Sequence, residues 1–169
     1  MIDPPDMIRL GPDPRPWIEQ VAEVHARREQ PAELLAALSV GLQHALGHIL
    51  FTVLVFDNAA GQMRRIFSTR PDINPVGGSK PITDSPWMRQ VLIGGRPYIG
   101  RSRQDLEEVF FDHEQLWAIG CESVLNMPVL WAGAVLGSLN LLHRAAWYDE
   151  QDIPTARVFA QLALPALRT

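Results

Sequence analysis

The chain has 169 residues, of which 47% are hydrophobic and 20% are charged, and its formal net charge is −4. This composition is typical of one folded domain, and it excludes bulk disorder, a collagen-like repeat and a pure coiled coil. The basic residues form no cluster, so we do not expect the phosphate-neutralising surface of a nucleic-acid-binding protein.

The number of cysteines and the length of the apolar runs indicate the cellular compartment in which the protein is expected. Cys121 is the only cysteine, which excludes an internal disulfide and a CxxC redox pair and favours a reducing cytoplasm. The longest apolar runs, such as 49–56, are far shorter than the roughly 18 residues of a membrane span, so no membrane crossing is expected. Residues 1–16 are rich in proline and charge and predict a flexible arm rather than a secretory signal, followed by a single domain over 17–169.

Two amphipathic helices are predicted near the N-terminus. Apolar residues recur at helical spacing after Pro16, and leucines do so again after Pro31. Pro31 suits a first helical turn, and Gly47 suits a left-handed cap at the end of the second helix. Residues 48–57, HILFTVLVFD, are apolar on both faces and predict a central strand that is covered on two sides.

A turn over 57–61 and a more exposed strand over 62–69 are expected next, with Met63, Arg65 and Phe67 on one side of that strand.

Proline and glycine interrupt every pattern between residues 70 and 119. We expect short helices over 85–92 and 104–117, and a brief strand around Tyr98. A long irregular insertion in a compact domain usually builds a binding site or is mobile.

Residues 123–131 and 134–143 are two apolar runs on either side of Ala132 and Gly133, which predicts a hairpin with a two-residue turn. With that turn, Met127 would oppose Ser138, because paired positions would sum to 265.

The same register would put Leu125 opposite Asn140, with Ser123 and Leu142 on the same face. The small Gly137, on the other face, would let a helix approach the sheet closely. A final helix is predicted to begin near Gln151, and Pro165 should interrupt its last turn. Its apolar stripe is Ala156, Phe159, Ala160, Ala163 and Leu167.

The order of these elements predicts an α+β fold with a mainly antiparallel sheet. Within it, residues 120–143, GCESVLNMPVLWAGAVLGSLNLLH, resemble the closing hairpin of GAF domains. The matching positions are Gly120, Ser123, Pro128, Val129, Gly133, Gly137, Leu139 and Asn140. The resemblance implies a five- to six-stranded GAF/PAS-like sheet, with the terminal helices bundled on one face and the broken middle segment over the other, closing a small-molecule pocket.

What the resemblance implies for function is a stand-alone sensory or regulatory domain. GAF domains mostly act as sensors or dimerisation modules, and their ligands include cyclic nucleotides, bilins, haem, 2-oxoacids and other small metabolites. We expect such a domain to bind a small metabolite and to act through a homodimer formed by its terminal helices or through a separate partner chain. Two alternatives stay open: a small metabolite-modifying enzyme of GAF fold, and a ligand-free protein-interaction scaffold.

Candidate ligand-binding residues come from two regions. The middle segment offers aromatic and charged side chains at Trp87, Arg89, Tyr98, Asp112, His113 and Trp117. Arginine presents a planar donor fork to carboxylate or phosphate, and tryptophan stacks on planar molecules, so the expected ligand is anionic or planar. Alternatively, the tryptophans anchor the segment to the core and Asp112 caps a short helix. The closing hairpin adds Ser123, Met127, Ser138 and Asn140, whose polar groups would bind a ligand or satisfy local backbone.

Cys121 is a further candidate contact, for which a buried, inert thiol is the favoured interpretation because neither a lowered pKa nor a nearby base is indicated. GAF-like free methionine sulfoxide reductases need a resolving thiol, which this chain lacks. His44 and His48 have metal-ligand spacing, but Gly47 separates them and no third ligand is indicated. We therefore expect no catalytic residue, metal or resident cofactor.

Overall fold

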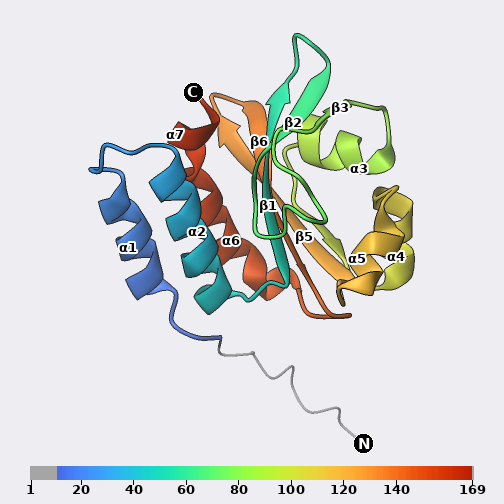
Figure 1. The fold of residues 1–169 in the computed structure, drawn as a ribbon, viewed down its shortest axis with the longest axis horizontal. Coiled ribbons are helices and arrows are strands. Elements are labelled where there is room, and N and C mark those ends of the chain that lie inside the picture. Colours follow the sequence, from blue (N-terminus) through green and yellow to red (C-terminus); the bar gives the residue numbers. More distant parts are fainter. Residues whose placement is uncertain (1–10, 169) are drawn as a thin grey trace, which may run out of the picture.

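The computed structural model describes residues 11–168, so residues 1–10 of the expected arm lie outside the described part and the domain boundary at residue 17 stays a prediction. Six strands form one antiparallel sheet in the order β3-β2-β1-β6-β5-β4 (Figure 1). They are β1 (Leu50–Asp57), β2 (Gln62–Ser68), β3 (Ser79–Pro81), β4 (Tyr98–Gly100), β5 (Ser123–Trp131) and β6 (Ala134–His143). The predicted α+β class and mainly antiparallel sheet are confirmed.

The helices from the two ends of the chain pack together on one face of the sheet (Figure 1). They are α1 (Arg15–Val24), α2 (Ala32–Ala45), α6 (Ile153–Leu162), which follows a 3₁₀ turn η2 (Glu150–Asp152), and α7 (Leu164–Leu167). Gly47, at φ +80°, donates its N–H to the carbonyl of Leu42 and ends α2, as predicted. The chain breaks between α6 and α7 next to Pro165, where the interruption was expected.

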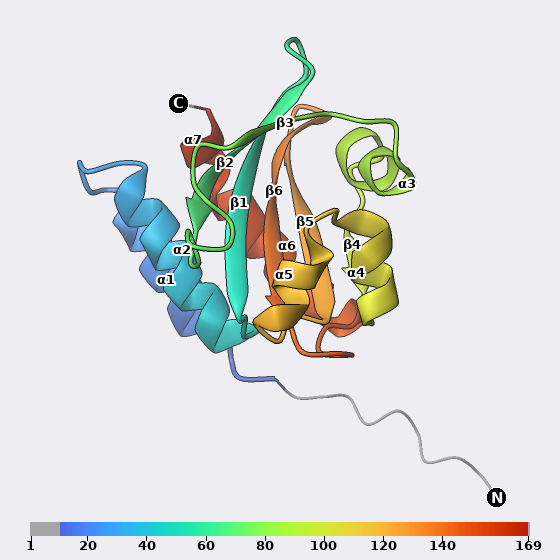
Figure 2. The ribbon, with the colours of Figure 1, turned by 45° about the vertical axis from the view of Figure 1, so that its right-hand side comes forward.

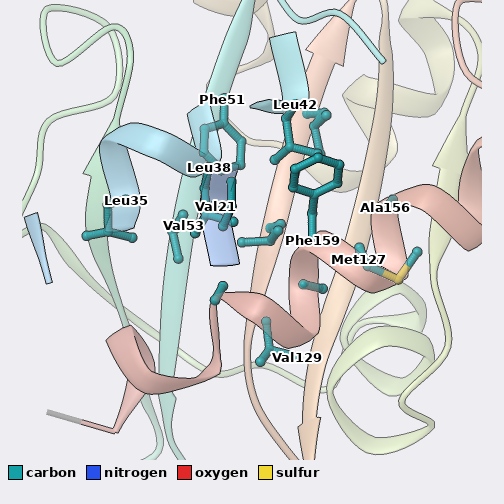
Figure 3. Packing of buried hydrophobic residues seen from close by; sticks show 14 of the residues in the cluster. Val21, Leu35, Leu38, Leu42, Phe51, Val53, Met127, Val129, Ala156 and Phe159 are labelled. Carbon is teal, nitrogen blue, oxygen red and sulfur yellow. The ribbon is translucent and has the colours of Figure 1, made fainter. Parts of the chain in front are cut away.

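The largest core cluster lies between these helices and the sheet (Figure 3). Phe159 of α6, Leu38 and Leu42 of α2 and Phe51 of β1 are fully buried in it. All five residues of the predicted α6–α7 stripe are buried. None of the helices in the described part of the chain is long and apolar enough to cross a bilayer.

Because Gly137 of β6 has no side chain, α7 packs close to the sheet at this position, as predicted. A Cβ atom built there would lie 2.5 Å from Cδ2 of Leu167 and 2.0 Å from the backbone oxygen of Leu54. Both distances are far below van der Waals contact, so no residue with a side chain fits without moving β1 or α7.

The middle segment covers the opposite face of the sheet (Figure 2). It contains α3 (Pro86–Met88), a π-helical turn η1 (Arg89–Ile93), α4 (Arg103–Val109) and α5 (His113–Ala118). The predicted stretch 104–117 is thus two helices rather than one, with a break at residues 110–112. Strand β3 was not predicted, because its three residues carry no alternation of apolar and polar side chains.

The predicted pairing of β5 with β6 is confirmed next to the turn, where Leu130 pairs with Val135 and Trp131 with Ala134, but it is wrong by one residue from Val129 back. In the structure Asn126 pairs with Asn140 and Met127 with Leu139, because a bulge shifts the register between Val129 and Leu130. Leu136 of β6 has no partner in β5. From Val129 back, the side chains of β5 therefore lie on the faces opposite to those that a regular hairpin would give them relative to β6, since side chains alternate along a strand.

The shifted register moves Ser123, Leu125 and Met127 to the face that carries the helices, whereas Asn126 faces the middle segment. A second bulge, at Ile66 of β2 opposite Val53 and Leu54 of β1, likewise puts Phe67 on the helix face and leaves Met63 and Arg65 on the other.

Leu130, which lies opposite the bulge at Leu136 of β6, is bonded to α6. Its N–H donates to Oε1 of Gln161 at 3.0 Å, and its carbonyl accepts from Nε2 of Gln161 at 2.9 Å. One side-chain amide therefore satisfies both backbone groups of Leu130. The side chain of Leu130 packs in the cluster of Trp87, Met88 and Val91, beneath α3 and η1.

Candidate ligand-binding cavity

A cavity of about 440 Å³ lies between the sheet and the middle segment, within the size range of small-molecule sites. Its floor comes from β1, β2, β3 and β6, and its cover from α3, α5 and the loops around them. The lining side chains include Thr52, Leu54, Met63, Arg65, Asn74, Lys80, Thr83, Trp87, Met88, Val109, Phe110, Phe111, Asp112, Leu116, Asn140 and Leu142.

A buried chain of hydrogen bonds, here called the polar ladder, crosses the floor of the cavity through Trp87, Asn126, Asn140, Ser138 and Thr52. Nε1 of Trp87 donates to Oδ1 of Asn126 at 3.0 Å, and Nδ2 of Asn126 donates to Oδ1 of Asn140 at 2.6 Å. Oγ of Ser138 donates to the same oxygen at 3.0 Å, while Nδ2 of Asn140 donates to Oγ1 of Thr52 at 3.2 Å. The ladder joins α3 to three strands and fixes the indole as a wall of the cavity.

A second group of polar side chains, here called the charged wall, consists of Arg65, Asn74, Lys80 and Asp112. Nδ2 of Asn74 donates to Oδ2 of Asp112 at 3.4 Å. Nζ of Lys80 lies 4.1 Å from the ring centroid of Phe111, a cation–π contact. The wall thus contains two cationic groups and one carboxyl group.

Burial sets the electrostatics of this wall. Desolvation lowers the pKa of Arg65 and that of Lys80, because a charged group loses hydration when it is buried. The nearby carboxylate of Asp112 opposes both shifts. Neither cation lies within 4.0 Å of a carboxylate oxygen in residues 11–168.

Of the residues singled out from the sequence, Trp87, Asp112 and Asn140 line the cavity, and Ser138 supports it through the polar ladder. Arg89 does not contribute, because its exposed guanidinium is paired with Asp84, with Nε 2.6 Å from Oδ1.

Other candidates lie outside the lining. Cys121 is a buried member of a small hydrophobic cluster under α4 and α5. Tyr98 and Trp117 pack against that cluster. His113 bonds through Nδ1 with the carbonyl of Phe110 at 2.8 Å. Ser123 donates to the carbonyl of Arg144 at 2.7 Å, and Met127 lies in the helix-side core.

Sequence reasoning missed Arg65, Asn74, Lys80 and Asn126. Arg65 lies on the same side of its predicted strand as Met63, which is a usable signal, but the weak alternation of that strand predicts that it is more exposed. Asn126 was placed on the wrong face because the bulge in the hairpin carries no sequence signature. Within residues 11–168, no group of three or more His, Cys, Asp or Glu side chains is arranged to hold a metal ion.

We expect the Cys121 thiol to resist alkylation in the folded protein. Burial raises its pKa to about 12, and the side chain is completely shielded from solvent. At pH 8 the thiolate fraction is then on the order of a thousandfold below that of an ordinary cysteine, so iodoacetamide should label it at least that much more slowly in buffer than in denaturing urea. Mass spectrometry of quenched time points measures both rates. Comparable rates would contradict the burial and revive a thiol-based enzyme mechanism.

Comparison with known families agrees with this architecture. The GAF domain model matches residues 31–167, which is most of the chain, and the protein therefore belongs to the GAF domain family. A search of curated protein sequences returned no match.

Solved structures share the fold at low sequence identity. The GAF domain of a phosphoenolpyruvate-protein phosphotransferase from Coxiella burnetii is 15% identical, with a TM-score of 0.71 and 92% of each chain covered. The GAF domain of a two-component sensor histidine kinase from Bacillus halodurans is 14% identical, with a TM-score of 0.64, covering 83% of this chain and 96% of that one. Free methionine-R-sulfoxide reductase from Neisseria meningitidis, solved with its substrate, is 16% identical, with a TM-score of 0.62 and coverages of 92% and 88%. The fold is thus shared with sensory domains and with an enzyme.

Proposed function

We propose that this GAF domain is a cytoplasmic sensory or regulatory module that binds a small metabolite in the cavity. The observation that carries the proposal is the cavity itself: about 440 Å³ of space with an aromatic wall at Trp87 and with two cations, Arg65 and Lys80, that form no salt bridge within residues 11–168. A space of this size favours a receptor over a ligand-free scaffold with a filled interior, and the sensor histidine kinase domain that shares the fold supports a sensory role.

The output of binding would pass through the terminal helices, either by homodimerisation or by contact with a separate partner chain. Val40 of α2 and Val158 of α6 are 48% and 42% exposed, so the outer surface of the helix bundle carries apolar side chains. A ligand changes such an association only by the difference between its affinities for the two states. Sedimentation velocity with and without ligand would report that difference.

Occupancy can be tested by filling the cavity. Val109→Trp would place a large ring in the lining, whereas Val76→Trp, at an exposed position outside it, is the matched control. A metabolite present at a hundredfold over its Kd should stabilise the native protein by about 2.7 kcal/mol. We expect fractions of a cell extract to raise the Tm of the wild type and of Val76→Trp, but not that of Val109→Trp.

Native mass spectrometry of the gently purified protein supplies the second measurement, because a retained ligand appears as extra mass. If no fraction shifts the Tm and no adduct is found, the receptor proposal is wrong and the ligand-free scaffold takes its place. If Val109→Trp responds as strongly as Val76→Trp, the ligand binds elsewhere on the domain.

A further inference from the structure

Arg65 is a buried arginine whose guanidinium, in the described part of the chain, is hydrogen-bonded through Nη1 but not along the edge formed by Nε and Nη2. Only 9% of the residue is exposed, and its Nη1 donates to the carbonyl of Pro75 at 3.1 Å. Its Nε is buried and has no hydrogen-bond partner among residues 11–168, although the side chain lines the cavity. A charged donor that is buried without an acceptor is costly. Nε is closed to a water-sized atom in this conformation, so the guanidinium must turn toward the cavity for an acceptor there to reach it.

Other arginines of the chain show what this edge binds. In Arg70, Nε lies 2.9 Å from Oδ1 of Asp72 and Nη2 lies 2.6 Å from Oδ2. Arg89 holds Asp84 with the same two nitrogens. In both cases a planar group with two oxygens meets the Nε and Nη2 edge side-on, which is the geometry that arginine offers to carboxylates. In Arg65 the protein occupies the opposite nitrogen, Nη1, and provides no carboxylate for this edge.

The charges around Arg65 indicate how much negative charge is missing. Lys80 and Arg65 supply two positive charges, and Asp112, held by Asn74, supplies one negative charge. A ligand with one negative charge balances the wall, whereas a phosphate monoester, at about −1.5 to −2, would overshoot. The remainder of the lining is mainly apolar, from side chains such as Leu54, Met63, Trp87, Met88 and Leu142.

We propose that the cavity binds a small monocarboxylate with an apolar body, and that the carboxylate bonds to Nε and Nη2 of Arg65 while Lys80 balances its charge. This inference rests on the proposed function and narrows its ligand class. It transfers the anion contact expected at Arg89 to Arg65, because the carboxylate of Asp84 already occupies Arg89.

Matched pairs of acids and amides test the proposal. Isothermal titration or ligand-observed NMR would give Kd values for phenylacetate, phenylacetamide, hexanoate, hexanamide and phenyl phosphate at constant ionic strength. We expect each acid to bind at least about tenfold more tightly than its amide, and phenyl phosphate to bind more weakly than phenylacetate. Arg65→Gln should weaken the acids by about tenfold or more and leave the amides unchanged. Arg89→Gln is the matched control and should bind like the wild type.

Arg65→Lys covers the case in which Arg65→Gln fails to fold, because it keeps the charge and loses the two-nitrogen edge; it should also bind the acids more weakly. Equal binding of acids and amides, tighter binding of phenyl phosphate, or acid binding that is insensitive to Arg65 would overturn the monocarboxylate site. If no acid binds while native mass spectrometry finds another occupant, this inference fails and the receptor proposal stands. If nothing binds in either experiment, both fail.

Discussion

Gly137→Ala should lower the free energy of unfolding by about 3 kcal/mol or more. The added methyl group would lie 2.0 Å from the backbone oxygen of Leu54 and 2.5 Å from Cδ2 of Leu167. A side-chain tip can rotate away, but a backbone oxygen within a sheet cannot move without disturbing the pairing of β1 with β6. Urea denaturation followed by circular dichroism measures the change.

Gly11→Ala is the control for this substitution, because nothing lies within 4 Å of a Cβ atom at that exposed position. It should leave stability within about 0.5 kcal/mol of the wild type. Adding Leu167→Ala to Gly137→Ala should recover little, since the contact with Leu54 remains. A Gly137→Ala protein as stable as Gly11→Ala would show that the sheet and α7 are farther apart than described.

Asn140→Leu should lower the free energy of unfolding by about 3 kcal/mol, because leucine fills the same space but neither accepts nor donates a hydrogen bond. Asn126 and Ser138 would each lose the acceptor for a buried donor, and Thr52 would lose the N–H that it accepts. Leaving a buried polar group unpaired typically costs 1–3 kcal/mol, and partial rearrangement keeps the total below the sum. The same urea experiment gives the value.

Thr52→Val provides a graded comparison with Asn140→Leu, because it breaks one hydrogen bond of the polar ladder at nearly constant shape; about 1 kcal/mol is expected. The double variant should lose less than the sum of the two, since both remove the bond between Thr52 and Asn140. Asn58→Leu, at an exposed turn position, controls for the chemical change. If Asn140→Leu behaves like Asn58→Leu, the ladder contributes nothing to stability.

The elements of the fold were predictable where periodicity is strong. The boundaries of β5 and β6 coincide with the predicted runs, and the buried stripe of α6 follows its 3.6-residue spacing. The resemblance to GAF domains further predicted that the terminal helices pack together on one face of the sheet. Strand β3 and the break before α5 escaped prediction, because three-residue elements between prolines and glycines lack a periodic signal.

The candidate site was less predictable, and one backbone irregularity explains much of the difference. The bulge at Leu136 of β6 shifts the faces of β5 relative to β6, so the regular hairpin register predicts Met127 and Ser123 in the cavity in place of Asn126. Arg65 could be placed on the right face of β2 from alternation alone, yet its burial depends on how the loop at Pro75 folds back over it, which no periodic pattern reports. No local pattern reports whether an arginine is paired on the surface, as Arg89 is, or enclosed.

Leu130 also has a mechanical consequence for how the two sides of the sheet communicate. Its side chain packs under α3 and η1 on the cavity side, and its backbone N–H and carbonyl are hydrogen-bonded to Gln161 of α6. A displacement of α3 or η1 that also moves Leu130 must therefore stretch or break its two hydrogen bonds to α6, on the other face of the sheet. Residue 130 thus connects the two faces of the sheet, since its side chain packs on one face and its backbone is bonded to a helix on the other.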